Sequence, residues 1–412
     1  SQDRALLTQL VYGALRWRGK LDWLLGKIVH WPLADMDGYL RNLLRLTVYQ
    51  ILFLDRVPSY AAVHEGVDLA KRYGGESAGG LVNAVARRLL REKNSLTALD
   101  SETDLVARLS IVGSHPDWLV RKWLAYLGEA DTEALLRANN EESPLVLRIN
   151  ALKTNRRALI EELQAAGIDA IAAPLSAEAI QIRNATAIDQ LPGFQEGRFL
   201  VQGEASQLVG LLLNPKPGER ILDACAAPGG KATHLAEMME DRGEVVATDI
   251  SARGIEKVRQ NIRRLNLKSV QPVQADVSLE LTGGLASPYD RILADLPCSG
   301  LGTLRSHPEA RWHREKKDIE RLSALQNKIL DRLFPCLKPG GILVYSTCTL
   351  TREENEDVVE DFLRRHKEFI LDNAAEFLPE SARHMVRGNY FLALPHRDGT
   401  DGFFGARMKK RA

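Results

Sequence analysis

The spacing of apolar residues changes at two points along the chain. Over residues 1–94 apolar side chains recur at helical spacing, for example around 43–54, and the pattern is interrupted at Pro58 and at the glycines 74–75. The same spacing continues in shorter runs to residue 140. This part of the chain therefore predicts an all-α domain over residues 1–140.

A stretch of mixed pattern follows. A strand-like run at 145–149 precedes an amphipathic helix at 155–167 that ends in glycine, and a second short strand is expected at 179–182. The pattern ends near 199–202. We therefore expect a small α+β, RRM-like subdomain over residues 141–202.

From Glu219 onward, predicted strands and helices alternate. Strands are expected at 220–223, 244–249, 270–275, 290–294 and 341–346, with helices at 231–240, 252–265, 319–334 and 353–365. This alternation is typical of an open parallel sheet with helices on both faces. The last two strands, 390–394 and 403–408, are expected to pair antiparallel. Residues 203–412 therefore predict an α/β Rossmann-like domain.

Composition agrees with a globular, multidomain protein and excludes several other classes. The chain has 412 residues, of which 45% are hydrophobic and 26% charged, and its net charge is +1. Apolar runs are far shorter than the ~18 residues of a membrane span, and the first residues lack the pattern of a signal peptide. We expect a cytoplasmic monomer without membrane contact.

The four cysteines are not spaced as zinc ligands, so we expect free thiols and no metal. Cys336 lies on the apolar side of a predicted helix and is expected to be a small buried hydrophobe. We favour the same interpretation, a small buried hydrophobe, for the side chain of Cys225. Cys298 and Cys348 lie instead in polar, turn-forming surroundings, where a ligand is expected.

A glycine loop follows the first strand of the alternating region. It reads Cys225-Ala226-Ala227-Pro228-Gly229-Gly230-Lys231, and it matches neither the phosphate-binding nor the dinucleotide-binding glycine motif. Asp249 ends the next strand, where a carboxylate can bind ribose hydroxyls, and Asp276 follows the third strand, where it can accept from an adenine amino group. Each aspartate alone is equally consistent with a helix cap. Together, the three features predict S-adenosyl-L-methionine as the ligand.

Two further motifs follow the fourth and fifth strands of this region. They are Asp295-Leu296-Pro297-Cys298-Ser299-Gly300 and Ser346-Thr347-Cys348-Thr349. Neighbouring strands lie ~4.8 Å apart, so the two thiols are expected to share one pocket. A thiolate that adds to carbon-6 of a pyrimidine makes carbon-5 nucleophilic, and a carboxyl group near nitrogen-3 can stabilise the developing charge. The pattern alone leaves open which cysteine attacks.

These motifs resemble the bacterial RsmB/Fmu (Sun) family of 16S ribosomal RNA cytosine-5 methyltransferases. The resemblance is carried by the glycine loop, both cysteine motifs, Arg305-Ser306-His307-Pro308, Glu353-Glu354-Asn355 and Asp401-Gly402-Phe403-Phe404. It implies that Cys348 is the nucleophile and that Cys298 assists product release. It also implies that Cys225–Lys231, Asp249, Asp276 and Asp295 line the methyl-donor site. Leu296 and Gly203 depart from the usual residues of the family.

Residues 1–94 resemble a NusB-like helical domain, which implies RNA binding; the resemblance is carried by Leu44–Tyr73 and Asn83-Ala84-Val85-Ala86-Arg87-Arg88. The resemblance to the RsmB/Fmu family implies 16S ribosomal RNA as the partner. Two alternatives remain: a transfer RNA cytosine-5 methyltransferase, and a non-catalytic NusB-like RNA-binding or antitermination factor.

The basic stretch 305–321 is consistent with RNA contact or with a solvated face. Thr351 and Glu354 fit a capping box for the last long helix.

Overall fold

The computed structural model describes residues 2–99, 104–184 and 187–412. Residues 1, 100–103 and 185–186, which fall within the first two predicted domains, lie outside the described residues. The chain divides into two compact units. One comprises Ser1–Glu141 together with His307–His313, and the other comprises Glu142–Ser306 and Arg314–Ala412.

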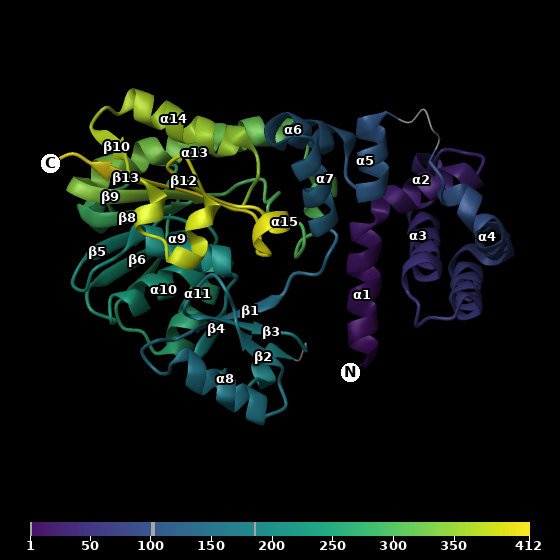
Figure 1. Cartoon of the computed structure of the whole chain (residues 1–412), viewed down its shortest axis with the longest axis horizontal. Helices are drawn as coiled ribbons and strands as arrows, with labels where there is room; N and C mark the ends of the chain where they lie inside the picture. Colours follow the sequence, from purple (N-terminus) through teal and green to yellow (C-terminus); the bar gives the residue numbers. More distant parts are fainter. Residues whose placement is uncertain (1, 100–103, 185–186) are drawn as a thin grey trace. The chain divides into compact units, whose positions relative to one another are not determined.

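The first unit is helical, as predicted (Figure 1). Its helices are α1 (Gln2–Arg16), α2 (Arg18–Ile28), α3 (Gly38–Phe53), α4 (Ser59–Thr97), α5 (Leu105–Gly113), α6 (Asp117–Leu127), α7 (Glu129–Ala138) and the short α12 (Ala310–His313). The break expected at residues 74–75 is a kink within α4, where Gly75 has a φ of 76°. No helix of the described residues is long and apolar enough to cross a membrane.

The return of His307–His313 to the helical unit was not predicted. Arg311 is fully buried there and donates to the Asn139 carbonyl at 3.0 Å and to Asn140 Oδ1 at 2.8 Å. Trp312 Nε1 donates to the Leu15 carbonyl at 2.7 Å. These side chains of the basic stretch therefore anchor a segment within the helical unit, and the RNA contact considered for the stretch does not extend to Arg311.

The second unit begins with a small antiparallel sheet in the order β2-β3-β1-β4. Its strands are β1 (Leu145–Ile149), β2 (Ala170–Ala172), β3 (Ala179–Ile182) and β4 (Phe199–Val201), and its helix is α8 (Arg156–Ala165). Leu147, Leu159 and Phe199 form its buried core. The predicted α+β subdomain is thus present, although β2 and β4 were not predicted as strands.

The rest of the second unit is built on a nine-stranded sheet in the order β11-β12-β13-β9-β8-β5-β6-β7, with β10 paired to β13. Its strands are β5 (Arg220–Asp223), β6 (Glu244–Asp249), β7 (Val270–Gln274), β8 (Tyr289–Asp295), β9 (Leu337–Thr347), β10 (Phe369–Leu371), β11 (Val386–Arg387), β12 (Tyr390–Ala393) and β13 (Phe403–Lys410). Strands β5 to β9 are parallel, whereas β13 runs antiparallel to β9 and to β12. The Rossmann-like prediction and the terminal antiparallel pair are confirmed.

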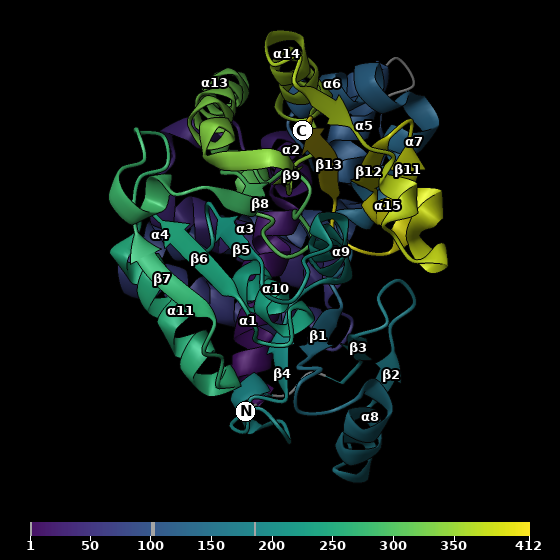
Figure 2. The same ribbon diagram turned by 90° about the vertical axis from the view of Figure 1, so that its left-hand side faces the viewer.

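Helices cover both faces of this sheet (Figures 1 and 2). They are α9 (Glu204–Leu213), α10 (Gly230–Met238), α11 (Ala252–Leu265), α13 (Lys316–Leu333) and α14 (Glu356–Arg365), followed by the short α15 (Pro395–Asp398). Strands β5, β6 and β7 follow one another toward one edge of the sheet, and strands β8, β9 and β13 follow one another toward the other edge, so the strand order reverses between β5 and β8. Ligands of such sheets bind beyond the carboxyl ends of the strands at this reversal.

Candidate active site

The glycine loop lies at the carboxyl end of β5 and leads into α10. Ala226 N–H donates to the Thr248 carbonyl at 2.7 Å, and Ala227 N–H donates to Asp249 Oδ2 at 3.2 Å, so β6 fixes the loop. Gly229 has a φ of 105°, and a Cβ added there would lie 3.2 Å from Val258 Cα. Glycine is required at this position both for the backbone conformation and for the close approach to α11.

Asp249 lies at the edge of a cavity of about 440 Å³. The cavity is lined by Ala227, Pro228, Ser251, Arg253, Gly254 and Lys257. Asp249 accepts from Ala227 N–H and from Ser251 N–H at 2.8 Å, and both donors line the cavity. A carboxylate in this position fits the ribose of an adenosine ligand.

Asp276 lies just beyond the carboxyl end of β7, next to β6. Its Oδ1 accepts from Ser278 N–H at 2.9 Å. Hydrogen bonds from the Ser278 side chain and backbone lower the pKa of Asp276, so this side chain stays a charged acceptor. Asp249 and Asp276 thus follow neighbouring strands, as the sequence predicted.

A cluster of charged groups surrounds the end of β8. Lys231 Nζ lies 2.7 Å from Asp295 Oδ2, and Ser346 Oγ donates to Asp295 Oδ1 at 2.7 Å. Burial lowers the pKa of Lys231, but the charge of Asp295 and its hydrogen bond outweigh burial, and the net shift is upward. Burial, and then the charge of Asp295, raise the pKa of the fully buried Asp223 to about 7. The cluster therefore keeps Lys231 cationic and holds a carboxyl that exchanges protons near neutral pH.

The two predicted thiols meet at this cluster. Cys298 Sγ lies 3.3 Å from Cys348 Sγ, because their parallel strands pair Asp295 with Ser346. The hydrogen bond to Cys348, followed by burial and the charges of Cys348 and Glu354, raises the pKa of Cys298 well above its usual value. The charge of Cys348 is also among the causes that raise the pKa of Lys231. The hydrogen bond to Cys348 and burial therefore hold Cys298 as a thiol.

Cys225 and Cys336 differ from this pair. Burial, followed by the charges of Asp223 and Asp295, strongly raises the pKa of the Cys225 thiol. Cys336 is buried at the base of β9, where burial raises its pKa as well. Both thiols are therefore protonated at neutral pH. Cys336 is the buried hydrophobe that the sequence predicted, whereas Cys225 is only partly buried.

Sequence reasoning missed the role of Glu354. This side chain is fully buried, and its carboxylate accepts from Ser299 N–H at 2.8 Å, Ser299 Oγ at 2.5 Å and Thr351 Oγ1 at 2.9 Å. The capping-box hypothesis is therefore wrong: α14 begins only at Glu356, and Glu354 reaches the residue after Cys298. A carboxylate at this point fixes the turn that carries the Cys298 thiol.

Two glycines allow the loops of the site to approach one another. Gly302 N–H donates to the Cys348 carbonyl at 2.9 Å, and Gly402 N–H donates to the Gly302 carbonyl at 2.8 Å. A Cβ at Gly302 would lie 2.2 Å from the Gly402 carbonyl oxygen. The loops after β8 and β9 and the loop before β13 therefore form one tightly packed backbone layer behind the thiols.

The chain is similar to known proteins over its whole length. Residues 210–409 match the family described as 16S rRNA methyltransferase RsmB/F, residues 1–91 match the NusB family, and residues 115–189 match the ferredoxin-like domain of RsmF/B-like methyltransferases. The chain is 37% identical to the probable ribosomal RNA small subunit methyltransferase B of Bacillus subtilis, over 100% of this chain and 91% of that protein. It is 38% identical to the ribosomal RNA small subunit methyltransferase B of Pseudomonas syringae, over 100% of this chain and 90% of that protein.

Solved structures extend the similarity to the fold. The crystal structure of PH0851 superposes with a TM-score of 0.83 at 29% identity, covering 98% of this chain and 90% of that one. A methyltransferase homolog from Pyrococcus horikoshii superposes with a TM-score of 0.64 at 29% identity, covering 75% of this chain and 99% of that one. The predicted family is confirmed by full-length relatives and by the matched domains: the chain belongs to the RsmB/F family of S-adenosylmethionine-dependent 16S rRNA methyltransferases, with a NusB domain at its N-terminus.

Proposed function

We propose that this protein transfers a methyl group from S-adenosyl-L-methionine to carbon-5 of a cytosine in 16S ribosomal RNA through a covalent cysteine adduct. The observation that supports this most strongly is the pair of thiols 3.3 Å apart, beside the Lys231–Asp295 ion pair at the carboxyl edge of the sheet. A methyltransferase that modifies an already nucleophilic atom has no use for two adjacent thiols. Activation of carbon-5 does require a nucleophile, followed by a base.

The residues at the carboxyl ends of β5, β6 and β7 fit S-adenosyl-L-methionine, which supplies an electrophilic methyl group when bound. The backbone of Cys225–Lys231 lies against the donor, Asp249 binds the ribose hydroxyls, and Asp276 accepts from the adenine amino group. Asp295 pairs with Lys231 of this loop and precedes Cys298 by three residues.

In the proposed reaction Cys348 adds to carbon-6 as a thiolate. Electron density moves toward nitrogen-3, where the proton shared by Lys231 and Asp295 neutralises it. Carbon-5 then takes the methyl group from the sulfonium of the donor. The hydrogen on carbon-5 must leave as a proton before the bond between carbon-6 and Cys348 Sγ can break. Cys298 loses its own proton to solvent and, as a thiolate, accepts the carbon-5 proton. The carbon-5–carbon-6 double bond re-forms, Cys348 leaves carbon-6 as a thiolate, and nitrogen-3 returns its proton to the Lys231–Asp295 pair.

The position of Cys298 supports its role as the base. Its Sγ lies 3.3 Å from Cys348 Sγ, so Cys298 is beside Cys348 when that residue is bonded to carbon-6. The hydrogen bond to Cys348, followed by burial, raises the pKa of Cys298, so this thiol is protonated while Cys348 is free.

We also propose that residues 1–140 bind RNA and that 141–202 and 203–412 form the small subdomain and the catalytic domain. In the helical unit, Tyr60 is 78% exposed and Tyr73 is 62% exposed, and the Arg72 guanidinium lies 5.6 Å from the Tyr73 ring. A groove of about 420 Å³ between the two halves of α4 includes Tyr60, His64 and Arg87. Exposed aromatic and basic side chains suit RNA bases and phosphates.

Glu354→Gln is expected to shift the pH dependence of product release to lower pH. The Glu354 charge is one cause of the raised Cys298 pKa, so the neutral amide lowers that pKa, and the thiolate forms at lower pH. The amide keeps one acceptor for Ser299. Single-turnover methylation and release should be measured from pH 6 to 9 (about the range in which thiols titrate). An unchanged or upward-shifted profile would contradict the proposed role of Cys298 as base.

The proposed substrate can be tested in cells. Bisulfite mapping of a deletion strain should show one cytosine of 16S ribosomal RNA that loses its 5-methyl mark. The full chain should restore the mark and the Cys348→Ala variant should not. Loss of a mark from transfer RNA instead would support the first alternative. Unchanged marks in both RNA classes would support the non-catalytic alternative and refute the proposal.

A further inference from the structure

We infer that Arg148, in the small subdomain, is a positioning residue for the methyl-donor loop, so that donor binding depends on a strand outside the Rossmann-like sheet. The inference rests on the proposed role of Cys225–Lys231 in binding the donor. Nothing in the sequence motifs points to Arg148, which lies in β1 and would face solvent in a simple alternating strand. It is instead fully buried.

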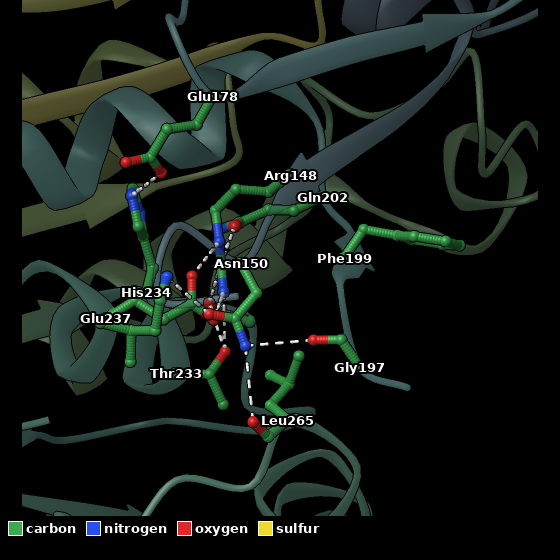
Figure 3. A network of polar contacts seen from close by, with 12 residues as sticks. Arg148, Asn150, Glu178, Gly197, Phe199, Gln202, Thr233, His234, Glu237 and Leu265 are labelled. Atoms are coloured by element: carbon green, nitrogen blue, oxygen red, sulfur yellow. Dashed lines mark hydrogen bonds and ion pairs between the residues drawn. The ribbon is translucent and has the colours of Figure 1, made fainter. Parts of the chain in front are cut away.

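The guanidinium of Arg148 bonds to one face of α10 (Figure 3). Its Nη1 donates to the Gly230 carbonyl at 2.6 Å, and its Nη2 donates to Thr233 Oγ1 at 3.1 Å and to Glu237 Oε1 at 3.0 Å. Residues 230, 233 and 237 recur at helical spacing, so a single planar group reaches three successive positions of this face. Gln202 accepts a further bond from Nη1.

The first of these contacts lies inside the donor loop. Gly230 is the first residue of α10 and stands between Gly229, with its left-handed backbone, and Lys231, which pairs with Asp295. The bond from Arg148 therefore fixes the peptide that sets the direction of the Lys231 side chain. The same bond fixes the first turn of the helix, whose free N–H groups face the ligand.

Charge makes the contact specific for arginine. Both side chains of the Arg148–Glu237 ion pair are almost fully buried, at 0% and 2% exposure. Burial raises the pKa of Glu237, and the nearby Arg148 charge opposes this shift. Only the forked guanidinium can satisfy Glu237, Thr233 and the Gly230 carbonyl at once, since a lysine ammonium lacks its planar, five-donor geometry.

The small subdomain has other connections to the same domain, and these provide a matched control. Asn150 Nδ2 donates to the Gly197 carbonyl at 3.1 Å and to the Leu265 carbonyl at 3.4 Å, at the far end of α11. Asn150 is also fully buried, and its bonds to Gly197 and Leu265 (Figure 3) do not touch the donor loop. A general loosening of the subdomain should therefore affect both residues, whereas loop positioning involves Arg148 alone.

The test compares Arg148→Lys with Asn150→Ala in the full chain. Both variants should lower the melting temperature. Calorimetry with S-adenosylhomocysteine should show that Arg148→Lys weakens binding by between about 10- and 100-fold, with the KM for RNA unchanged, whereas Asn150→Ala binds as the unmodified protein does. Equal affinity in Arg148→Lys, or an equal loss in both variants, would overturn the inference.

Two further variants separate a failure to fold from a failure of either proposal. If Arg148→Lys does not fold, the double variant Arg148→Met/Glu237→Leu removes both buried charges together, which proteins commonly tolerate, and should show the same loss of donor affinity. Asp249→Ala separates the two proposals. If neither the unmodified protein nor this variant binds the donor analogue, the proposed donor site itself is wrong. If Asp249→Ala weakens binding but the Arg148 variants do not, only the positioning role fails.

Discussion

The Cys348→Ala variant is expected to transfer no methyl group to RNA. Without its sulfur, carbon-6 of the cytosine receives no nucleophile, and carbon-5 remains unreactive toward the donor. Removing a catalytic nucleophile lowers kcat by roughly 10⁴-fold or more in enzymes with covalent intermediates. Incorporation of labelled methyl groups into 16S ribosomal RNA measures the effect.

Cys336→Ala is the matched control, because it removes a buried thiol of the same domain that lies at the opposite end of β9. It should retain activity. Donor affinity should be the same in both variants, since neither thiol belongs to the donor loop. If Cys348→Ala keeps substantial activity while Cys298→Ala is inactive, the roles assigned to the two thiols are reversed.

Asp295→Asn is expected to produce the next largest loss, about 10²- to 10³-fold in kcat, the usual cost of removing one group that stabilises developing charge. The amide keeps the size of the side chain and the acceptor for Ser346 Oγ, but it loses the charge that pairs with Lys231. Asp295 raises the pKa of Lys231 against the effect of burial. In the variant the pKa of Lys231 falls. The alkaline limb of the pH–activity profile should therefore shift to lower pH.

The same strand offers a control for this substitution. Asp290, near the start of β8, pairs with Lys338 Nζ at 2.6 Å and accepts from Arg220 N–H at 2.9 Å. Asp290→Asn therefore removes an equivalent carboxylate–lysine pair at the amino end of β8. Its kcat and its pH profile should match those of the unmodified protein. Equal losses in the two variants would mean that Asp295 acts only in folding.

The sequence predicted the parts of the site that lie at strand ends. Alternation of strands and helices located the ends of β5 to β9, and the parallel order of neighbouring strands then implied that Cys298 and Cys348 share a pocket. Their Sγ–Sγ distance of 3.3 Å agrees with that expectation. Patterns of this kind report on neighbours within one element or on adjacent strands.

Contacts between distant segments could not be predicted in this way. Arg148 reads as the polar position of an alternating strand, yet its partners lie more than 80 residues later, on α10. Glu354 satisfies the residue pattern of a capping box, but its carboxylate reaches Ser299, 55 residues earlier. Arg311 belongs to a stretch for which RNA contact and a solvated face were the two hypotheses, and it is buried in the helical unit. Each case depends on tertiary packing that leaves no local periodicity.

The covalent step can be observed directly by denaturing electrophoresis of the Cys298→Ala variant after incubation with 16S ribosomal RNA and S-adenosyl-L-methionine. In this variant Cys348 can still attack and carbon-5 can still be methylated, but the carbon-5 proton is not removed. We predict an RNA–protein adduct that survives denaturation and is absent from the Cys298→Ala/Cys348→Ala double variant. An adduct formed by Cys348→Ala instead, or full turnover by Cys298→Ala without any adduct, would contradict the proposed mechanism.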